Sequence, residues 1–524
     1  MKRILILLLF SSATVYGVEK VKFAPHTFTL PDGYALKRVA APPLVQRPNV
    51  IVIMSDDQGG GDYGFMGNNV IRTPELDAMT KRSGLLSKFY VSPVCAPTRA
   101  SLMTGLLPHN HGVLMVTHTT DDDQSCLRTE YPHWAQHLKS AGYHTGYFGK
   151  WHVERTSRLE DFGWQVNGAR GTPYFDQRME MKGGENRPHT DYVLRWDHEW
   201  PEGYDTSILY GVTDVPVEDR MLGVTTELAL EFLQDATEKD DPWCCFASVI
   251  EPHDPFITGT EAFSQYSVAD LPLCPNIHDT LEGQPGLYRK TAKVWASMTD
   301  RQKQEAAACY YGMITEIDQQ FGRLIDKVIE ADQYENTIIV FTSDHGELLG
   351  SHGMYCKNIS GYEEVYNIPM VVTGPGLAQG AVSQARIGLH DLCPTLLKLT
   401  DCTPIDHPDS RSHAAVLYDP KEHDSGFQTG FAEYFGGRIY LTQRVIYDGD
   451  WKLLFNGFDI DELYNLQNDP YEMSNLAADP AYDAQLKHMF GLLWQQVQKT
   501  GDHSLLNSHY PPMRLAPYGP NITT

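Results

Sequence analysis

The sequence predicts an α/β protein with a large mixed, mostly parallel sheet flanked by helices, followed by a smaller C-terminal subdomain with an antiparallel sheet. Two observations support this prediction. Short continuous apolar runs of strand length alternate with longer segments of helical periodicity, and such runs are typical of parallel strands buried on both faces. Near residue 430 this alternation ends, and closely spaced strands follow one another.

The first residues predict a cleaved signal peptide. Lys2 and Arg3 precede the apolar run Ile4 to Phe10, and small and polar residues continue to Gly17. Because the run is much shorter than the ~20 residues of a membrane span, we expect an exported protein, periplasmic or extracellular, without a membrane span. The predicted segments are a signal peptide at 1–17, an N-terminal arm at 18–46, a catalytic domain at 47–430 and a C-terminal subdomain at 431–524.

The charge balance argues against two classes of partner. The 42 basic and 67 acidic residues give a formal net charge of -25, so we expect no nucleic acid and no anionic membrane surface as a partner. The chain of 524 residues is long enough to bury a large core. An anionic substrate would therefore depend on positive charge placed locally at its binding site.

The first strand is expected at Asn49 to Met54, and Asp56 and Asp57 come directly after it. Ligands of open α/β sheets collect at the carboxyl ends of the strands. Since two adjacent carboxylates are costly to hold together without a cation, we interpret this pair as metal ligands. An isolated Asp-Asp pair is also common in solvated turns.

Next we expect a helix from Thr73-Pro74 to Gly84, followed by a strand at Leu85 to Val91 that leads to Cys95. Pro97 favours a first helical turn and places Cys95 at a helix N-terminus, where free N–H groups attract an anion. Arg99, one turn further, is expected to reach the same anion. The alternative for Cys95 is a small buried side chain that packs as a hydrophobe.

A helix from Trp134 to Gly142 and a strand from Tyr143 to Phe148 should follow, and Lys150 and His152 come directly after that strand. The segment 155–217 is rich in Gly, Pro, Trp and Tyr and weakly periodic, so we expect irregular binding loops. Four of its side chains are candidates for a sugar site, although surface packing explains them equally well: Trp196, His198, Trp200 and Tyr204.

Buried strands continue to deliver polar residues at their carboxyl ends. His253 follows one of them, Asp344 and His345 follow another, and Lys357 lies a short distance beyond. The expected elements are a helix at Glu218–Leu233, a strand at Trp243–Ile250, a long helix around Tyr310–Val328, strands at Thr337–Thr342 and Met370–Thr373, and a helix at Asp391–Leu399.

The nine cysteines leave an even set of eight once Cys95 is set aside, and these could pair in an oxidising compartment. Cys393 and Cys402 are candidates for one pair. The alternative is that most are buried free thiols, and the Cys244-Cys245 pair lies inside an apolar run typical of the core.

The run Cys95-Ala96-Pro97-Thr98-Arg99, continued by Leu102-Met103-Thr104-Gly105, resembles the signature of the type I sulfatases of the alkaline phosphatase superfamily. In that family the cysteine is oxidised to formylglycine, and the Pro and Arg are required for this modification. Gly149-Lys150-Trp151-His152 and the Asp461–Leu466 run also resemble the family, and the resemblance spans residues 47 to about 480.

The resemblance implies one divalent cation, with Ca2+ expected, and an oxygen-rich ligand set. His345 stands where many members have Asn, and nitrogen is an unusual ligand for calcium. The implied metal ligands are Asp56, Asp57, Cys95, Asp344 and His345. The implied catalytic residues are Cys95, Arg99, Lys150, His152, His253 and Lys357.

The function implied is hydrolysis of sulfate esters. The hydrated aldehyde would attack sulfur and then release sulfate with His152 as base, while His253 protonates the departing oxygen. Export favours a sulfated carbohydrate, from algal polysaccharide or glycosaminoglycan, as the substrate. The implied partner is a formylglycine-generating or anaerobic maturation enzyme. Two alternatives stay open, a phosphodiesterase or phosphonate monoesterase of the same superfamily, and an inactive protein that binds sulfated glycans.

Overall fold

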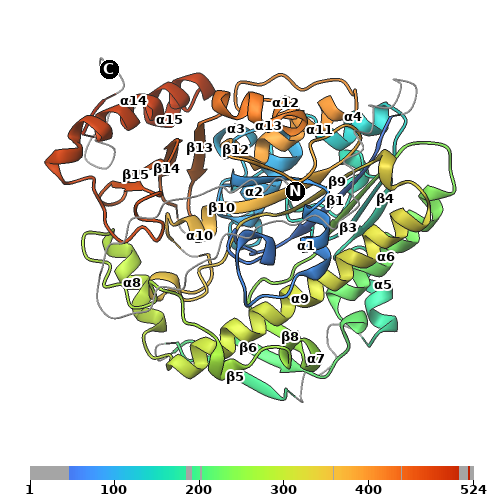
Figure 1. The fold of residues 1–524 in the computed structure, drawn as a ribbon, viewed down its shortest axis with the longest axis horizontal. Helices are drawn as coiled ribbons and strands as arrows, with labels where there is room; N and C mark the ends of the chain where they lie inside the picture. The colour runs from blue at the N-terminus through green and yellow to red at the C-terminus, as the bar shows by residue number, and fades with distance from the viewer. Residues whose placement is uncertain are drawn as a thin grey trace, which may run out of the picture.

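A computed structural model describes residues 47–183, 192–200, 203–357, 359–437, 440–506 and 517–519. The predicted signal peptide and the N-terminal arm therefore lie outside the described residues. Figure 1 shows a large central sheet with helices on both faces and a separate smaller sheet beside it. This arrangement confirms the predicted α/β fold with its antiparallel C-terminal sheet.

Nine described strands form the central sheet, in the order β11-β2-β10-β9-β1-β7-β3-β4, with β12 beside β2. The five strands from β9 to β4 run parallel, whereas β10 is antiparallel to both of its neighbours. The bounds are β1 Asn49–Ser55, β2 Gly84–Tyr90, β3 His144–Gly149, β4 Val166–Ala169, β7 Trp243–Ser248, β9 Thr337–Ser343, β10 Asn367–Thr373, β11 Ala381–Ser383 and β12 Ile387–Gly388.

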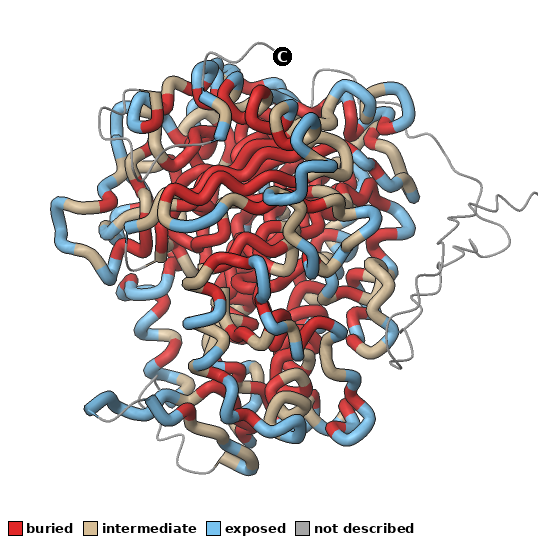
Figure 2. The backbone as a smooth tube through the Cα atoms, turned by 90° about the vertical axis from the view of Figure 1, so that its left-hand side faces the viewer, coloured by how far each residue is buried: buried red, intermediate tan, exposed pale blue. Residues whose placement is uncertain are grey.

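Two hydrophobic layers hold the helices against this sheet. One face packs on α2, α4 and α11, and the other packs on α1, α6 and α9. Both faces of β1 are buried, as its continuous apolar run predicts, and Figure 2 shows buried backbone throughout the centre. The bounds of these helices are α1 Pro74–Thr80, α2 Cys95–Thr104, α4 Trp134–Ser140, α6 Met221–Thr237, α9 Asp300–Glu330 and α11 Leu392–Leu399.

The C-terminal sheet is antiparallel and packs on α14, which covers it at the edge of the molecule (Figure 1). Its strands are β13 Thr429–Tyr434, β14 Gln443–Asp448, β15 Trp451–Asn456 and β16 Glu462–Asn465. The other helices are α3 Pro108–His111, α5 Pro173–Met181, α7 Thr260–Phe263, α8 Gly286–Trp295, α10 Glu363–Tyr366, α12 Ala414–Tyr418, α13 Pro420–His423, α14 Asp483–Thr500 and α15 His503–Leu506.

The segment 155–217 is more regular than expected. It contributes β4 to the central sheet, contains α5, and forms β5 Leu194–His198 and β6 Ser207–Thr213 of a three-stranded sheet with β8 Phe256–Gly259. The prediction of irregular loops was wrong because these strands are short and partly exposed, which leaves little periodicity to read. The prediction that Gly84 ends a helix was also wrong. Helix α1 ends at Thr80, and Gly84 is the first residue of β2.

All nine cysteines are free thiols in the structure, so Cys393 and Cys402 do not form the candidate pair. Cys244 and Cys245 lie fully buried in β7, as expected. Among the described residues, no helix combines the length and apolar character that crossing a membrane requires.

Candidate active site

The parallel strands β1 and β9 lie side by side and end at the same edge of the sheet. Asp56 and Asp57 follow β1, and Asp344 and His345 follow β9, so their side chains meet at this edge. One ligand atom from each of the four lies within 4.8 Å of those of the others, and all four are fully buried. The structure thus brings together four of the five side chains predicted to bind a metal, and the fifth, Cys95, is not part of this group.

This cluster fits a cation. Three carboxylates in one buried site repel one another, and Asp56 Oδ1 and His345 Nε2 have no hydrogen-bond partner among the described residues. Burial lowers the pKa of His345, but the charges of Asp344 and Asp57 raise it to about 9. A divalent ion bound between these atoms would satisfy both orphan atoms and balance the carboxylates.

Cys95 is the first residue of α2 and is 2% exposed. Burial alone would raise the pKa of its thiol, but the charges of Lys150 and His152, and a hydrogen bond with His152, hold that pKa well below its usual range. Position 95 is therefore an anion-stabilising position beside the carboxylate cluster, as a helix N-terminus favours.

Arg99 lies one turn further along α2 and is fully buried. Its Nε donates to Asp344 Oδ2 at 2.8 Å, and its Nη1 donates to Ser248 Oγ at 2.6 Å and to the Lys150 carbonyl oxygen at 3.0 Å. These contacts hold its guanidinium behind the carboxylates, and it does not line the pocket. Its Nη2 lies 3.5 Å from Asp56 Oδ2 and has no hydrogen-bond partner among the described residues, so the expectation that Arg99 reaches the substrate anion stays a prediction.

Lys150 follows β3, and its Nζ contacts the Asp56 carboxylate. The turn that places it requires glycine at position 149. Gly149 has φ of 87°, and a Cβ there would lie 2.0 Å from the Ser248 carbonyl oxygen of the neighbouring strand. The close approach of β3 and β7 thus sets the position of Lys150 beside the cluster.

Lys357 and His253 lie on the other side of the cluster. Lys357 Nζ contacts both carboxylate oxygens of Asp57 at 3.0 Å and His253 Nε2 at 2.8 Å. His253 Nδ1 lies 2.6 Å from the Asp254 carbonyl oxygen. Since a backbone carbonyl only accepts, Nδ1 donates to it, and Nε2 faces the Lys357 ammonium.

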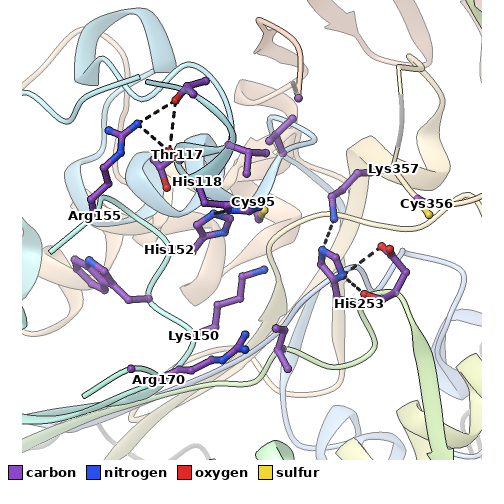
Figure 3. Close-up of a pocket in the computed structure, with 18 of the residues that line it drawn as sticks. Cys95, Thr117, His118, Lys150, His152, Arg155, Arg170, His253, Cys356 and Lys357 are labelled. Carbon is purple, nitrogen blue, oxygen red and sulfur yellow. Dashed lines mark hydrogen bonds and ion pairs between the residues drawn. The ribbon is translucent and has the colours of Figure 1, made fainter. Parts of the chain in front are cut away.

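One pocket with a cavity of about 1170 Å³ is lined by Cys95, Lys150, His152, His253 and Lys357. Arg99 and the four clustered side chains are not among its lining residues. Figure 3 shows Cys95, Lys150 and His152 on one side of this pocket and His253 with Lys357 on the other. The arrangement offers positive charge from two directions to one anionic group beside Cys95.

Several residues of the site were missed from the sequence. His118 Nδ1 lies 3.2 Å from His152 Nε2, and Ser248 binds Arg99. Glu347 is a further buried carboxylate whose pKa is held well above its usual range by burial and by the charge of Asp57. Glu347 stands three residues after Asp344, which was the available signal, whereas nothing in the sequence links His118 to His152.

The central sheet gathers carboxylates and lysines at its strand ends, an arrangement that suits a hydrolase acting on an anionic ester. The sequence model named Sulfatase matches residues 48–402, and that named N-sulphoglucosamine sulphohydrolase, C-terminal, matches 350–499. The chain belongs to the sulfatase family and is a sulfuric ester hydrolase.

Two curated relatives and one solved structure illustrate the likeness. Choline-sulfatase from Rhizobium meliloti is 26% identical over 83% of this chain and 83% of its own. Ulvan-active sulfatase from Formosa agariphila is 25% identical over 88% of this chain and 84% of its own. A structure solved in complex with its substrate D-glucosamine-2-N,6-O-disulfate has a TM-score of 0.68 at 20% identity, covering 87% of this chain and 99% of that chain.

Proposed function

We propose that this protein is an exported sulfatase that hydrolyses sulfate esters of a carbohydrate through a formylglycine made from Cys95. The observation that carries the proposal is the position of Cys95, buried at a helix N-terminus between Lys150, His152 and the carboxylate cluster. The Cys-Ala-Pro-Thr-Arg run around it suits a maturation signal, and a protein that only bound sulfate would not need one.

The carboxylates of Asp56, Asp57 and Asp344 would hold one divalent cation together with His345. Calcium is our first choice because three carboxylates are hard oxygen ligands, although a histidine nitrogen is unusual for it. A cation there would polarise a sulfate oxygen and stabilise negative charge on the side chain at position 95. Arg99 acts as a positioning residue, because its contacts with Asp344 and Ser248 fix the ligand geometry.

The formylglycine hydrate would supply two hydroxyl groups on one carbon, one for attack on sulfur and one for release of sulfate. The other steps belong to this chain's own residues. Lys150 and Lys357 bind the sulfate oxygens from opposite sides of the pocket. His152 takes the hydroxyl proton that must leave when sulfate is released. The Lys357–His253 pair supplies the proton for the departing alcohol oxygen.

A sulfated carbohydrate is the substrate class that the pocket supports best. The family includes relatives named for choline sulfate and for ulvan, so membership alone leaves small and polymeric substrates open. The cavity of about 1170 Å³ is larger than the ~300–1,000 Å³ of most small-molecule sites. A sugar from algal polysaccharide or a glycosaminoglycan oligosaccharide would occupy that space, whereas choline sulfate would leave most of it empty.

Two measurements test the proposal. Peptide mass spectrometry of the active, exported protein should show formylglycine at position 95, and Cys95→Ala should abolish hydrolysis of sulfate esters. A panel of defined sulfated sugars should then yield free sulfate, with matched phosphate esters as the control. Full activity from unmodified cysteine would refute the formylglycine, and faster hydrolysis of phosphate esters would support the phosphodiesterase alternative.

A further inference from the structure

Trp295, the last residue of α8, lines both the catalytic pocket and a second cavity of about 380 Å³. On the catalytic side, His198, Trp200 and Trp295 form an aromatic wall. The His198 ring centroid is 4.4 Å from that of Trp200 and 4.6 Å from that of Trp295. Because Trp295 is only 7% exposed and lines both spaces, its indole stands between the two cavities.

The chain passes from one cavity to the other within two residues. Tyr355 lines the second cavity, whereas Cys356 and Lys357 line the catalytic pocket. Lys357 contacts Asp57 and is one of the side chains proposed to bind the cleaved sulfate. Consecutive Cα atoms are about 3.8 Å apart, so both cavities lie within the reach of one oligosaccharide.

The second cavity is lined mainly by basic charges. Arg289 and Lys293 come from α8, and Lys303 comes from α9. Asp279 is the one acidic side chain among the described residues that line the cavity. Lys303 contacts Asp300 at 3.1 Å, and Asp300 is not a lining residue. In a chain with a net charge of -25, this concentration of positive charge suits an anionic ligand.

Two of these basic side chains differ in what they contact. Arg289 Nη1 donates to the carbonyl oxygens of Leu281 at 2.9 Å and Gln284 at 2.7 Å, so its guanidinium is fixed by the backbone. Lys293 is exposed, and its ammonium makes no hydrogen bond or ion pair with any residue that the structure describes. The charge of Lys293 is therefore available to a ligand of this cavity.

His352 adds a buried nitrogen to the same cavity. It is fully buried, its Nδ1 lies 2.6 Å from Asp279 Oδ2, and its ring stacks on Tyr362 with the centroids 3.6 Å apart. Because an ionised carboxylate only accepts, Nδ1 donates in this contact. Nε2 has no hydrogen-bond partner within the described parts of the chain. A buried nitrogen without a partner in a cavity-lining residue requires an explanation, and a bound ligand supplies one.

We propose that the second cavity binds a sulfate group on a neighbouring unit of the saccharide whose sulfate ester is cleaved in the catalytic pocket. This inference rests on the proposed sulfatase function, because that function supplies the sulfated saccharide. The ammonium of Lys293 and the Nε2–H of a charged His352 ring bind the oxygens of this second sulfate. Since the two contacts belong to one molecule, the second adds to the affinity of the first. The preferred substrate is therefore an oligosaccharide or polymer with sulfate on at least two units.

The test compares two inhibitors of nitrophenyl sulfate hydrolysis by the mature protein, glucose 6-sulfate and a tetrasaccharide of dextran sulfate. Only the tetrasaccharide is long enough to occupy both cavities. Lys293→Gln should raise the inhibition constant of the tetrasaccharide about threefold, within the range of an exposed ion pair, and leave that of glucose 6-sulfate unchanged. Lys290→Gln is the matched control, because Lys290 is an exposed lysine of the same helix that lines neither cavity.

His352→Asn tests the buried nitrogen. The asparagine amide can donate to Asp279 in place of Nδ1, and asparagine tolerates the φ of 51° at this position, so the substitution removes mainly Nε2. It should weaken inhibition by the tetrasaccharide about tenfold, as expected for a lost hydrogen bond to a charged group, and inhibition by glucose 6-sulfate by less than about twofold.

The tetrasaccharide carries several sulfate groups, so the comparison between Lys293→Gln and Lys290→Gln decides the question. Equal inhibition constants of the tetrasaccharide for these two variants would overturn the second site. An effect of Lys293→Gln on inhibition by inorganic sulfate would identify a site for the free anion and would overturn the saccharide as its occupant. If nitrophenyl sulfate is not hydrolysed, the proposed function fails, and calorimetric titration of the tetrasaccharide into the same variants still tests the second cavity.

Discussion

Replacing His253 by alanine should separate substrates by the basicity of their leaving groups. A sugar alkoxide is a poor leaving group and needs a proton in the transition state, whereas a nitrophenolate does not. General acid help contributes about 10²–10⁴ in rate, equivalent to about 3–5 kcal/mol of the barrier. His253→Ala should therefore slow a sugar sulfate by about that factor and affect nitrophenyl sulfate by less than about tenfold.

The structure explains why the loss should be selective. Lys357 Nζ is 2.8 Å from His253 Nε2 but also contacts both Asp57 oxygens at 3.0 Å, so Lys357 stays in place when the ring is removed. Single-turnover cleavage of both substrates is the assay. His253→Gln is the control, since its amide oxygen accepts from Lys357 but does not pass a proton on. Equal losses on the two substrates, or recovery by the glutamine, would mean that His253 only positions Lys357.

Three further predictions concern the metal, one glycine and one histidine. Chelation should abolish activity and lower the melting temperature, because the carboxylates lose their counter-ion, and added Ca2+ should restore both; unchanged activity without metal would contradict the cation site. Gly149→Ala should lower the free energy of unfolding in urea by at least about 2 kcal/mol, because its Cβ would meet the Ser248 carbonyl oxygen at 2.0 Å. Gly142→Ala is the control. Gly142 also has a positive φ, but no atom of the described residues lies within 4 Å of its Cβ, so this change should cost only about 1 kcal/mol. Burial lowers the pKa of His109, but the charge of Glu433 raises it to about 9. Because the pKa of histidine is about 6.5 in the unfolded chain, the raised pKa of His109 contributes about 3 kcal/mol to the free energy of unfolding. This contribution is fully present below pH ~6.5 and is lost as the pH rises through about 9. His109→Gln should therefore flatten the dependence of stability on pH in that window.

The central sheet was predictable because its strands are buried on both faces. A run such as Asn49 to Met54 has no polar face, so its sequence alone marks it as an interior strand, and the residues that follow it mark the edge where ligands collect. The edges of the sheet gave no such signal. β4 is four residues long and half of it is only partly buried, and it still positions Arg170 in the pocket.

The candidate catalytic side chains could be chosen from the sequence, and the structure places most of them around one pocket, but their contacts could not be predicted. Arg99 illustrates the difference. Its place one turn after Cys95 is a property of the helix, whereas its direction depends on acceptors from β7 and from beyond β9, namely Ser248 and Asp344. Because those two strands are distant in the sequence and lie on either side of β1 in the sheet, only the fold shows that the guanidinium contacts the carboxylate cluster.

In the aromatic segment before β6, sequence periodicity does not predict which side chains line the cavity. Trp196, His198 and Trp200 alternate as one face of a strand would, yet Trp196 does not line the cavity while the other two do. The pairing of β5 with β6 shifts register between Trp196 and Asp197, so the alternation of side chains is interrupted there. Trp295, which completes the wall, comes from α8 and has no sequence relation to β5. A cavity wall assembled across a bulge and from two distant segments is set by tertiary packing, so neither the alternation of side chains nor their distance along the sequence could have predicted it.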